Sequence, residues 1–431
     1  MRANCLLSRM EKHPALGFAL ALLLVCSGCT TTAPLACPDP GARARAAKVY
    51  FATDRTPTPG PGPSFGSAPA DPPQLYLGWE RVVIGPQHRL GRVDAAVVRT
   101  GIHSVQSPGG FSAPESLAEA DAAIEAFVGT TVRSTIRSSP VPSPGEKRQV
   151  LIFIHGFNNS FDEAIRKTAQ LAADLELVDC KGQERGVPIA YTWPSASSVF
   201  GYLADEESAE WTQQRLAPFL GALARVCREE GAELQVIAHS MGARLLVRSL
   251  ADLASSSSGR QPTGLMFDQI ILLAPDIGKG IFEQYLERIV PLVDHLTIYV
   301  SSKDGALNLS RILHGGHRRV GLLESSFLAA LELTGIPTLS RRVGDRPVRG
   351  GVGDDFAGTK IDMIDVSGGI AARLGHSYED PEFIGDLKEL IYNGTPAGTG
   401  ARSNLIPGRA SAELFRNVGA GASRYFRLKA D

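Results

Sequence analysis

One apolar stretch that ends in a serine and turns at once into a helical pattern constrains this chain more than any other feature. Residues 234–238 read Leu-Gln-Val-Ile-Ala, and His239-Ser240-Met241-Gly242 follows directly. From Met241 onward, apolar residues recur at spacings of three and four, which predicts a helix with one buried stripe. A strand that turns sharply into a helix at a serine between small residues is the layout of a nucleophile elbow. Ser240 is therefore the candidate nucleophile.

The surroundings of this serine also predict two groups that would bind a negatively charged oxygen. The N–H of Met241 opens the helix, where the dipole and unpaired N–H groups favour developing negative charge. Upstream, residues 150–156 read as a buried strand that ends in His-Gly, so the N–H of Phe157 is a second candidate donor. The simpler interpretation of this His-Gly pair is a plain strand terminator. A capping box, Ser160 to Glu163, then opens another helix.

An acid and a base follow in the chain order of α/β-hydrolases. The strand at 295–300 leads to Asp304, and the strand at 361–366 precedes His376. The order Ser, Asp, His is that of α/β-hydrolases and differs from those of chymotrypsin and subtilisin. We predict Asp304 as the orienting acid and His376 as the base. Asp276, which follows an earlier strand, is the alternative acid and otherwise a structural residue that caps the next turn.

Further motifs make the likeness to a known family specific. They are Phe51-Ala-Thr-Asp-Arg55, Phe153-Ile-His-Gly-Phe-Asn158, Thr192-Trp-Pro-Ser195, Gly201-Tyr-Leu-Ala-Asp205, Ala238-His-Ser-Met-Gly242, Ala274-Pro-Asp276, Tyr299-Val-Ser-Ser-Lys-Asp304 and Gly375-His-Ser-Tyr378. This set resembles a bacterial esterase/lipase-like α/β-hydrolase family catalogued as domain of unknown function 900, over roughly residues 48–392. The resemblance implies an α/β-hydrolase sheet and serine-hydrolase chemistry, and it names no substrate.

The strand and helix patterns point to the same fold class. Four strand–helix alternations between residues 150 and 300 predict a mostly parallel sheet with helices on both faces, and 431 residues at 43% hydrophobic composition can bury such a core. The predicted function is hydrolysis of carboxylic esters through an acyl-enzyme, esterase-like or lipase-like, without a cofactor. The alternative is a non-catalytic envelope lipoprotein that uses the scaffold for binding or assembly. A small ester or lipid is the expected substrate.

The N-terminus reads as a lipoprotein signal. Basic residues precede the apolar run 15–25, and Cys26-Ser27-Gly28-Cys29 follows. A small pair directly before a cysteine resembles a bacterial lipobox, although Cys26 stands where leucine is usual. Cys29 is thus the expected lipidation site, and a plain secretory signal is the alternative. We expect a lipid-anchored protein of the cell envelope, with the outer membrane facing the periplasm favoured because Thr30 follows Cys29 in place of aspartate.

The expected organisation follows from these assignments. It comprises a signal peptide (1–28), a tether (29–47), N-terminal strands with a loop-rich extension (48–145), a hydrolase core (146–394) containing an insertion that could be a lid (311–360), and a loop-like tail (395–431). The Pro- and Gly-dense stretch 57–73 predicts an irregular surface loop. The apolar pieces between 75 and 98 predict leading strands of the sheet or, alternatively, a small accessory β unit.

Four remaining features have modest implications. The net charge of −1, without a basic tract, gives no indication of a nucleic-acid partner, and the oligomeric state is left open. Cys180 and Cys227, each near the end of a predicted helix, are considered as a disulfide pair. His314 and His317 on a glycine loop are weak evidence for a metal, and none is predicted. Trp193 and Tyr202 are expected in the core rather than in an acyl pocket.

Overall fold

The structure is a computed structural model. It describes residues 36–37, 43–59, 64–71, 73–93, 96–106, 114–141, 147–196, 201–255, 265–322, 360–367, 381–393, 405–407 and 424–428.

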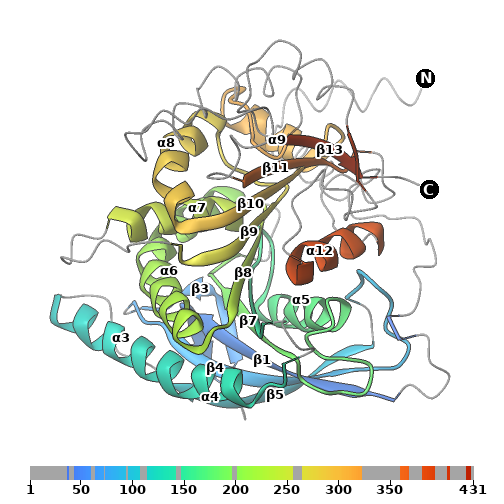
Figure 1. Cartoon of the computed structure of the whole chain (residues 1–431). Coiled ribbons are helices and arrows are strands. Elements are labelled where there is room, and N and C mark those ends of the chain that lie inside the picture. Colours follow the sequence, from blue (N-terminus) through green and yellow to red (C-terminus); the bar gives the residue numbers. More distant parts are fainter. Residues whose placement is uncertain are drawn as a thin grey trace, which may run out of the picture.

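An 11-stranded sheet forms the centre of the molecule (Figure 1). Its strands, in chain order, are β1 (Arg45–Thr53), β4 (Tyr76–Ile84), β5 (Val97–Gln106), β6 (Gln149–Ile154), β7 (Gly186–Thr192), β8 (Glu233–His239), β9 (Phe267–Leu273), β10 (Val293–Val300), β11 (Lys360–Asp365), β12 (Leu405–Pro407) and β13 (Arg424–Leu428). They lie in the order β12-β13-β11-β10-β9-β8-β6-β7-β1-β4-β5. In this spatial order, every neighbouring pair between β13 and β1 is parallel. The antiparallel pairs β12–β13, β1–β4 and β4–β5 lie toward the two edges of the sheet. The predicted mostly parallel sheet is confirmed.

Helices cover both faces of this sheet. They are α3 (Pro114–Phe127), α4 (Arg133–Ser138), α5 (Phe161–Asp174), α6 (Tyr202–Glu230), α7 (Met241–Ser255), α8 (Lys279–Ile289), α9 (Gly305–Leu313) and α12 (Pro381–Asn393). In β6, Ile152 and Ile154 join the core under α6, α7 and α8, whereas Leu151 and Phe153 join the core under α5 and α12. Alternate residues of a strand point to opposite faces, so a strand buried on both faces reads as a continuous apolar run.

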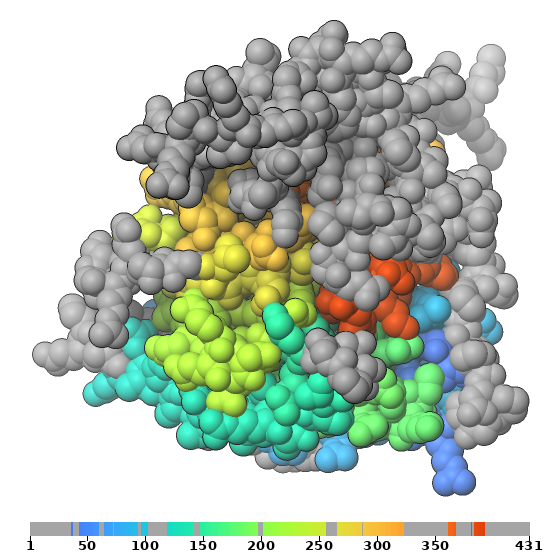
Figure 2. All heavy atoms as spheres, viewed as in Figure 1, coloured from blue at the N-terminus to red at the C-terminus, as the bar shows by residue number. Residues whose placement is uncertain are grey.

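The surface beside the sheet is held together partly by ion pairs. In Figure 2 the teal α3–α4 segment and the yellow-green α6 form one continuous face. Arg137 of α4 binds Glu230 of α6 at 2.8 Å, and Arg225 of α6 binds Glu125 of α3. None of the helices in the described ranges is both long and apolar enough to cross a membrane.

The N-terminal region is more ordered than the sequence predicts. β4 and β5 are leading strands of the main sheet, so the alternative of a separate accessory unit is wrong. The Pro-rich stretch contains a two-stranded sheet of β2 (Arg55–Thr58) and β3 (Ser64–Pro69), where an irregular loop was expected. Phe65 of β3 explains the difference, because its ring is buried 4.9 Å from that of Phe161 and 5.9 Å from that of Phe51.

The region after α9 and the tail also differ from expectation. The predicted insertion, 311–360, begins inside α9, which ends at Leu313. Within it, residues 318–322 pack along the turn after β9: Val320 N–H donates to the carbonyl of Ile277 and Gly321 N–H to that of Pro275, both at 3.0 Å. Residues 323–359 lie outside the described residues. The tail was expected to be loop-like, but β12 and β13 join the sheet, where β13 satisfies the exposed backbone edge of β11.

The cysteine pairing differs from the one considered. Cys180 forms a disulfide with Cys37, and Cys227 is a buried free thiol whose pKa is raised by burial. Cys180 lies between α5 and β7, on the side of α5, whereas Cys227 belongs to α6 in the core of the opposite face. The sheet between the two helices keeps these thiols apart.

Candidate active site

Ser240 lies at the junction of β8 and α7 in a strained backbone conformation. Its φ is 52°, in the left-handed region that residues other than glycine rarely adopt. Its N–H donates to the carbonyl of Leu273 at 2.9 Å, and its carbonyl accepts from the N–H of Asp276 at 3.0 Å. The turn places the serine at the carboxyl end of β8 and at the N-terminus of α7, which is the geometry of the predicted elbow.

Two glycines allow the backbone to pack tightly around this turn. A Cβ on Gly242 would collide with the carbonyl oxygen of His155. A Cβ on Gly156 would lie 2.7 Å from Nδ1 of His239 and 2.9 Å from Cβ of Ser240. The elbow and the end of β6 are therefore in direct contact, which explains why small residues occupy both positions.

The β6–α5 loop, residues 155–160, follows this contact. The side-chain amide of Asn159 donates to the carbonyl of Phe157 at 2.8 Å and to that of Gly156 at 3.3 Å. Asn158 has a φ of 58°. The Phe157 ring packs edge-on against that of Tyr202, and Met241 is fully buried as the first residue of α7. The two predicted oxyanion donors, Phe157 and Met241, thus belong to adjoining segments. The loop ends at the predicted capping box: Ser160 Oγ accepts from Glu163 N–H, and the Glu163 carboxylate accepts from Ser160 N–H.

A buried polar cluster behind this loop was missed from the sequence. The guanidinium of Arg55 is fully buried and donates to the carbonyls of Asn159 at 2.7 Å and Gly66 at 3.1 Å, and it lies 3.2 Å from Nε2 of His155. The carboxylate of Asp205 accepts from Ser195 Oγ and, at 2.6 Å, from the N–H of Ala196.

This cluster gathers motifs that had no assigned role. Arg55 ends the first motif of the resemblance, Ser195 the third and Asp205 the fourth, and all of them meet at the β6–α5 loop. The N–H of Asn158 donates to Asp205, and the N–H of Asn159 donates to Ser195 Oγ at 3.3 Å. The motifs themselves were the available signal, but sequence spacing could not show that they converge.

The electrostatics of this cluster are those of a buried cation beside a neutral imidazole. Burial lowers the pKa of Arg55 to about 10, so the side chain remains a cation at neutral pH. Burial and the adjacent Arg55 hold the pKa of His155 well below its usual range. The His155 ring also stacks on Trp193, with ring centroids 5.0 Å apart, and the Trp193 indole N–H donates to the carbonyl of His155 at 2.7 Å. Trp193 is thus a core residue, as expected.

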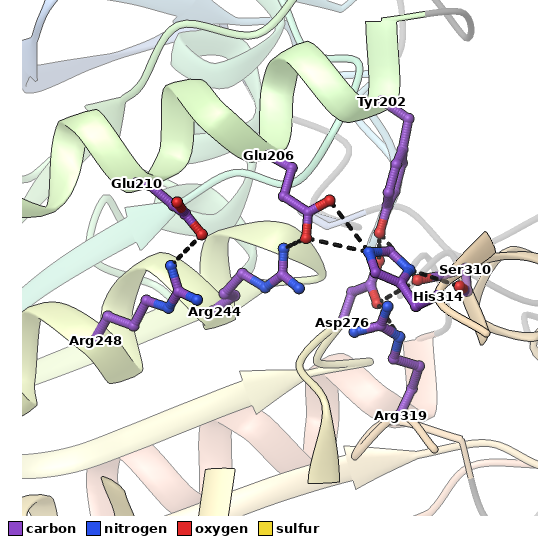
Figure 3. A network of polar contacts seen from close by, with 9 residues as sticks. All are labelled: Tyr202, Glu206, Glu210, Arg244, Arg248, Asp276, Ser310, His314 and Arg319. Atoms are coloured by element: carbon purple, nitrogen blue, oxygen red, sulfur yellow. Dashed lines mark hydrogen bonds and ion pairs between the residues drawn. The ribbon is translucent and has the colours of Figure 1, made fainter. Parts of the chain in front are cut away.

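Asp276 is the centre of a second buried network (Figure 3). Its carboxylate accepts from the hydroxyls of Tyr202 at 2.6 Å and Ser310 at 2.7 Å, and Nε of Arg319 lies 3.3 Å away. Burial, reinforced by Asp276, raises the pKa of Tyr202. The Asp276 side chain therefore ties α6, α9 and the segment after α9 together, and it does not cap the turn that follows it.

Asp304 lies beyond the carboxyl end of β10 and is fully buried. One carboxylate oxygen, Oδ1, accepts from the N–H of Leu307 at 2.8 Å and caps α9. This bond holds the carboxylate in a defined orientation at the same edge of the sheet as Ser240. His376, the predicted base, and Cys29, the predicted lipidation site, both lie outside the described residues.

The Asp276 network continues along α6 toward α7 (Figure 3). Glu206 of α6 binds Arg244 of α7 and, at 3.1 Å, Nε2 of His314 after α9. One turn further along α6, Glu210 binds Arg248 at 2.5 Å. Nδ1 of His314 also lies 2.7 Å from the Ser310 carbonyl, so both ring nitrogens face acceptor oxygens. Within the described ranges, His, Cys, Asp and Glu side chains form no group of three that could hold a metal.

Comparison with known proteins supports the scaffold. Residues 140–338 match the profile of a family described as an alpha/beta hydrolase of unknown function (DUF900). This stretch contains β6 to α9, with the elbow, Asp276 and Asp304, and it ends before His376. A search of curated proteins finds no match. Together with the topology, the match identifies an α/β-hydrolase scaffold.

Proposed function

We propose that this chain is a serine hydrolase that cleaves carboxylic esters through an acyl-enzyme, with esterase-like or lipase-like specificity. The observation that carries the proposal is the strained Ser240, held at a φ of 52° between a strand and a helix N-terminus in an α/β-hydrolase scaffold. Strained residues of this kind persist where the surrounding structure over-determines them, and they cluster at active sites. A serine in an ordinary turn has no need of this conformation.

The roles follow from the placement of the side chains. Ser240 attacks the ester carbonyl, His376 takes the proton and returns it to the leaving alcohol, and water then resolves the acyl-enzyme. Asp304 orients His376. The N–H of Leu307, which donates to Oδ1 of Asp304, holds this carboxylate in place. Asp276 is less suited to be the acid, because its two oxygens already accept hydrogen bonds from Tyr202 and Ser310.

The proposed oxyanion hole consists of the N–H groups of Phe157 and Met241. They belong to segments that touch, since Gly156 lies against Ser240 and Gly242 against His155. Two preorganised donors at the developing oxyanion each contribute on the order of 3 kcal/mol of transition-state stabilisation.

The experiment is labelling by a fluorophosphonate probe together with hydrolysis of short p-nitrophenyl esters. We expect the unmodified protein to be labelled and active, and Ser240→Ala to lose both properties while it remains folded. Ser249→Ala is the matched control, because Ser249 is buried on the same helix and its hydroxyl lies within hydrogen-bonding distance of the Leu245 and Gln213 carbonyls. A folded but unlabelled unmodified protein would favour the non-catalytic lipoprotein, and full activity of Ser240→Ala would refute the assignment.

We also propose that the chain is a lipoprotein of the cell envelope, anchored through Cys29 and facing the periplasm. The Cys37–Cys180 disulfide supports an oxidising compartment, because disulfides are rare where thiols are kept reduced. We expect Cys29→Ser to move the protein from the membrane fraction to the soluble fraction. If the unmodified protein is found in the membrane fraction with residues 1–28 still attached, lipidation at Cys29 is contradicted.

A further inference from the structure

We infer that Arg55 is a positioning residue for the oxyanion hole: it fixes the proton of His155 on Nδ1 and thereby aims the N–H of Phe157. The inference rests on the proposed function, because it concerns the same site. Arg55 reaches the β6–α5 loop from β2, which is far away in the sequence.

The first step is the position of the proton on His155. Nδ1 lies 2.8 Å from the Gly156 carbonyl, an acceptor, and Nε2 lies 3.2 Å from the Arg55 guanidinium, which only donates. A neutral imidazole satisfies both contacts only with its proton on Nδ1. Nε2 also lies 3.1 Å from the carbonyl of Trp193, which would favour a proton on Nε2 in the absence of Arg55. The cation beside Nε2 therefore selects between two tautomers that the pocket could otherwise hold.

The second step links this proton to the Phe157 N–H. The Gly156 carbonyl accepts from Nδ1 of His155 and, at 3.3 Å, from the Asn159 amide. In a planar trans peptide the carbonyl and the following N–H point in opposite directions. His155 Nδ1 and the Asn159 amide both hold the Gly156 carbonyl on one side of the peptide. The N–H of Phe157, which belongs to the same peptide, therefore points to the opposite side. With the proton on Nε2, the lone pair of Nδ1 would repel the same carbonyl.

The third step explains why an arginine is needed. The same guanidinium also donates to the carbonyls of Asn159, at the end of the loop, and of Gly66, on the neighbouring β3. A planar fork with five N–H donors can serve these acceptors simultaneously, whereas a lysine ammonium is a single point donor. Arg55 therefore fixes both the tautomer of His155 and the far end of the loop.

The test compares Arg55→Met and Arg55→Lys with Arg215→Met. Arg215 is a matched control, because it is a buried arginine of α6 that pairs with Asp54, the neighbour of Arg55, and donates to the carbonyl of Trp211 in the same helix. Esterase kinetics give kcat and KM separately. Selective 15N-histidine labelling, with His155 assigned through His155→Gln, shows which ring nitrogen carries the proton.

We expect the unmodified protein to carry the proton of His155 on Nδ1, and Arg55→Met to move it to Nε2, toward the Trp193 carbonyl. Loss of one aligned oxyanion donor should lower kcat by about 100-fold with little change in KM. The kcat of Arg55→Lys should lie between those of Arg55→Met and the unmodified protein. Arg215→Met should keep a kcat near that of the unmodified protein.

Two results would overturn the inference. One is a proton on Nε2 in the unmodified protein, which requires no variant to fold. The other is a kcat of folded Arg55→Met or Arg55→Lys equal to that of Arg215→Met. Failure of the proposed function is distinguished by the unmodified protein itself, which would then show no hydrolysis dependent on Ser240.

Discussion

At the scale of the residue, backbone strain at Ser240 is the defining feature. A left-handed φ at a non-glycine residue costs on the order of 1–3 kcal/mol and must be held by its surroundings. Ala274, at the end of the neighbouring β9, also has a positive φ, of 43°, and the two strained turns are joined by the hydrogen bond from Asp276 N–H to the Ser240 carbonyl. Gly242 also packs closely against the end of β6, and this contact helps to hold the strained turn at Ser240.

Gly242→Ala should therefore destabilise the protein, because the new methyl group meets the backbone carbonyl of His155, which cannot move without disturbing β6. We expect a loss of about 1–3 kcal/mol in the free energy of unfolding, measured by urea denaturation. Gly280→Ala is the matched control: that glycine lies in α8 with open space around a Cβ, so alanine should be neutral or stabilising by up to about 1 kcal/mol. Equal stabilities of the two variants would contradict this account of the elbow.

At the scale of the element, charged side chains join α7, the helix that follows Ser240, to α6 and to the C-terminal end of α9. Glu206 of α6 lies between Arg244 of α7 and His314 after α9 (Figure 3). Burial alone would raise the pKa of Glu206, but Arg244 and His314 outweigh it and hold the pKa below its usual value of 4.5. Arg244 is itself nearly fully buried, so loss of Glu206 would leave a buried positive charge without its partner.

Glu206→Gln should cost about 2 kcal/mol of stability at neutral pH, because it leaves the buried Arg244 without its counter-charge. The folded pKa of Glu206 is depressed, so the stabilisation is present above the unfolded pKa of 4.5 and is lost as the pH falls through the folded pKa. Thermal unfolding of the unmodified protein and the variant should therefore differ at pH 7 and converge as the pH falls below 4.5 and through the folded pKa of Glu206. Glu210→Gln, at an exposed pair, should change stability by less than about 1 kcal/mol. A difference between Glu206→Gln and the unmodified protein that persists at low pH would exclude this ion pair as its cause.

At the scale of the whole molecule, one covalent link joins the chain N-terminal to the sheet with the loop between α5 and β7. The Cys37–Cys180 disulfide spans 143 residues of sequence. A cross-link over a loop this long restricts the unfolded chain strongly, with a stabilisation of about 2–5 kcal/mol.

Double substitution Cys37→Ser/Cys180→Ser should lower the free energy of unfolding by that amount, as measured by denaturation under non-reducing conditions. Peptide mapping of the unmodified protein should recover a Cys37–Cys180 linked peptide, and Cys227 should react with a thiol reagent only after unfolding, because it is buried in the core. A linked peptide that contains Cys227 would show that the pairing is different.

The sequence and the structure agree best where local pattern decides. Apolar runs predicted β6, β8 and β9, and helical spacings predicted the helices that follow β6 and β8. The Ser160–Glu163 capping box was also correct, because all of these signals involve residues close together in the chain. The sequence pattern did not predict β2 and β3, because their Pro and Gly residues are typical of loops, although Phe65 packs this pair of strands against the core. It also did not predict the short strands β12 and β13 of the tail.

The amino-acid sequence by itself determined the fold class, the elbow around Ser240 and the carboxylates that follow β9 and β10, because each of these is a local pattern of residue types. Only the tertiary structure decided that Cys37, and not Cys227, pairs with Cys180, that Asp276 is engaged by Tyr202 and Ser310, and that Arg55 and Asp205 meet behind the β6–α5 loop. These contacts join residues that are distant in the chain. They depend on which strands become neighbours and which face each helix covers, and no spacing along the sequence carries that information.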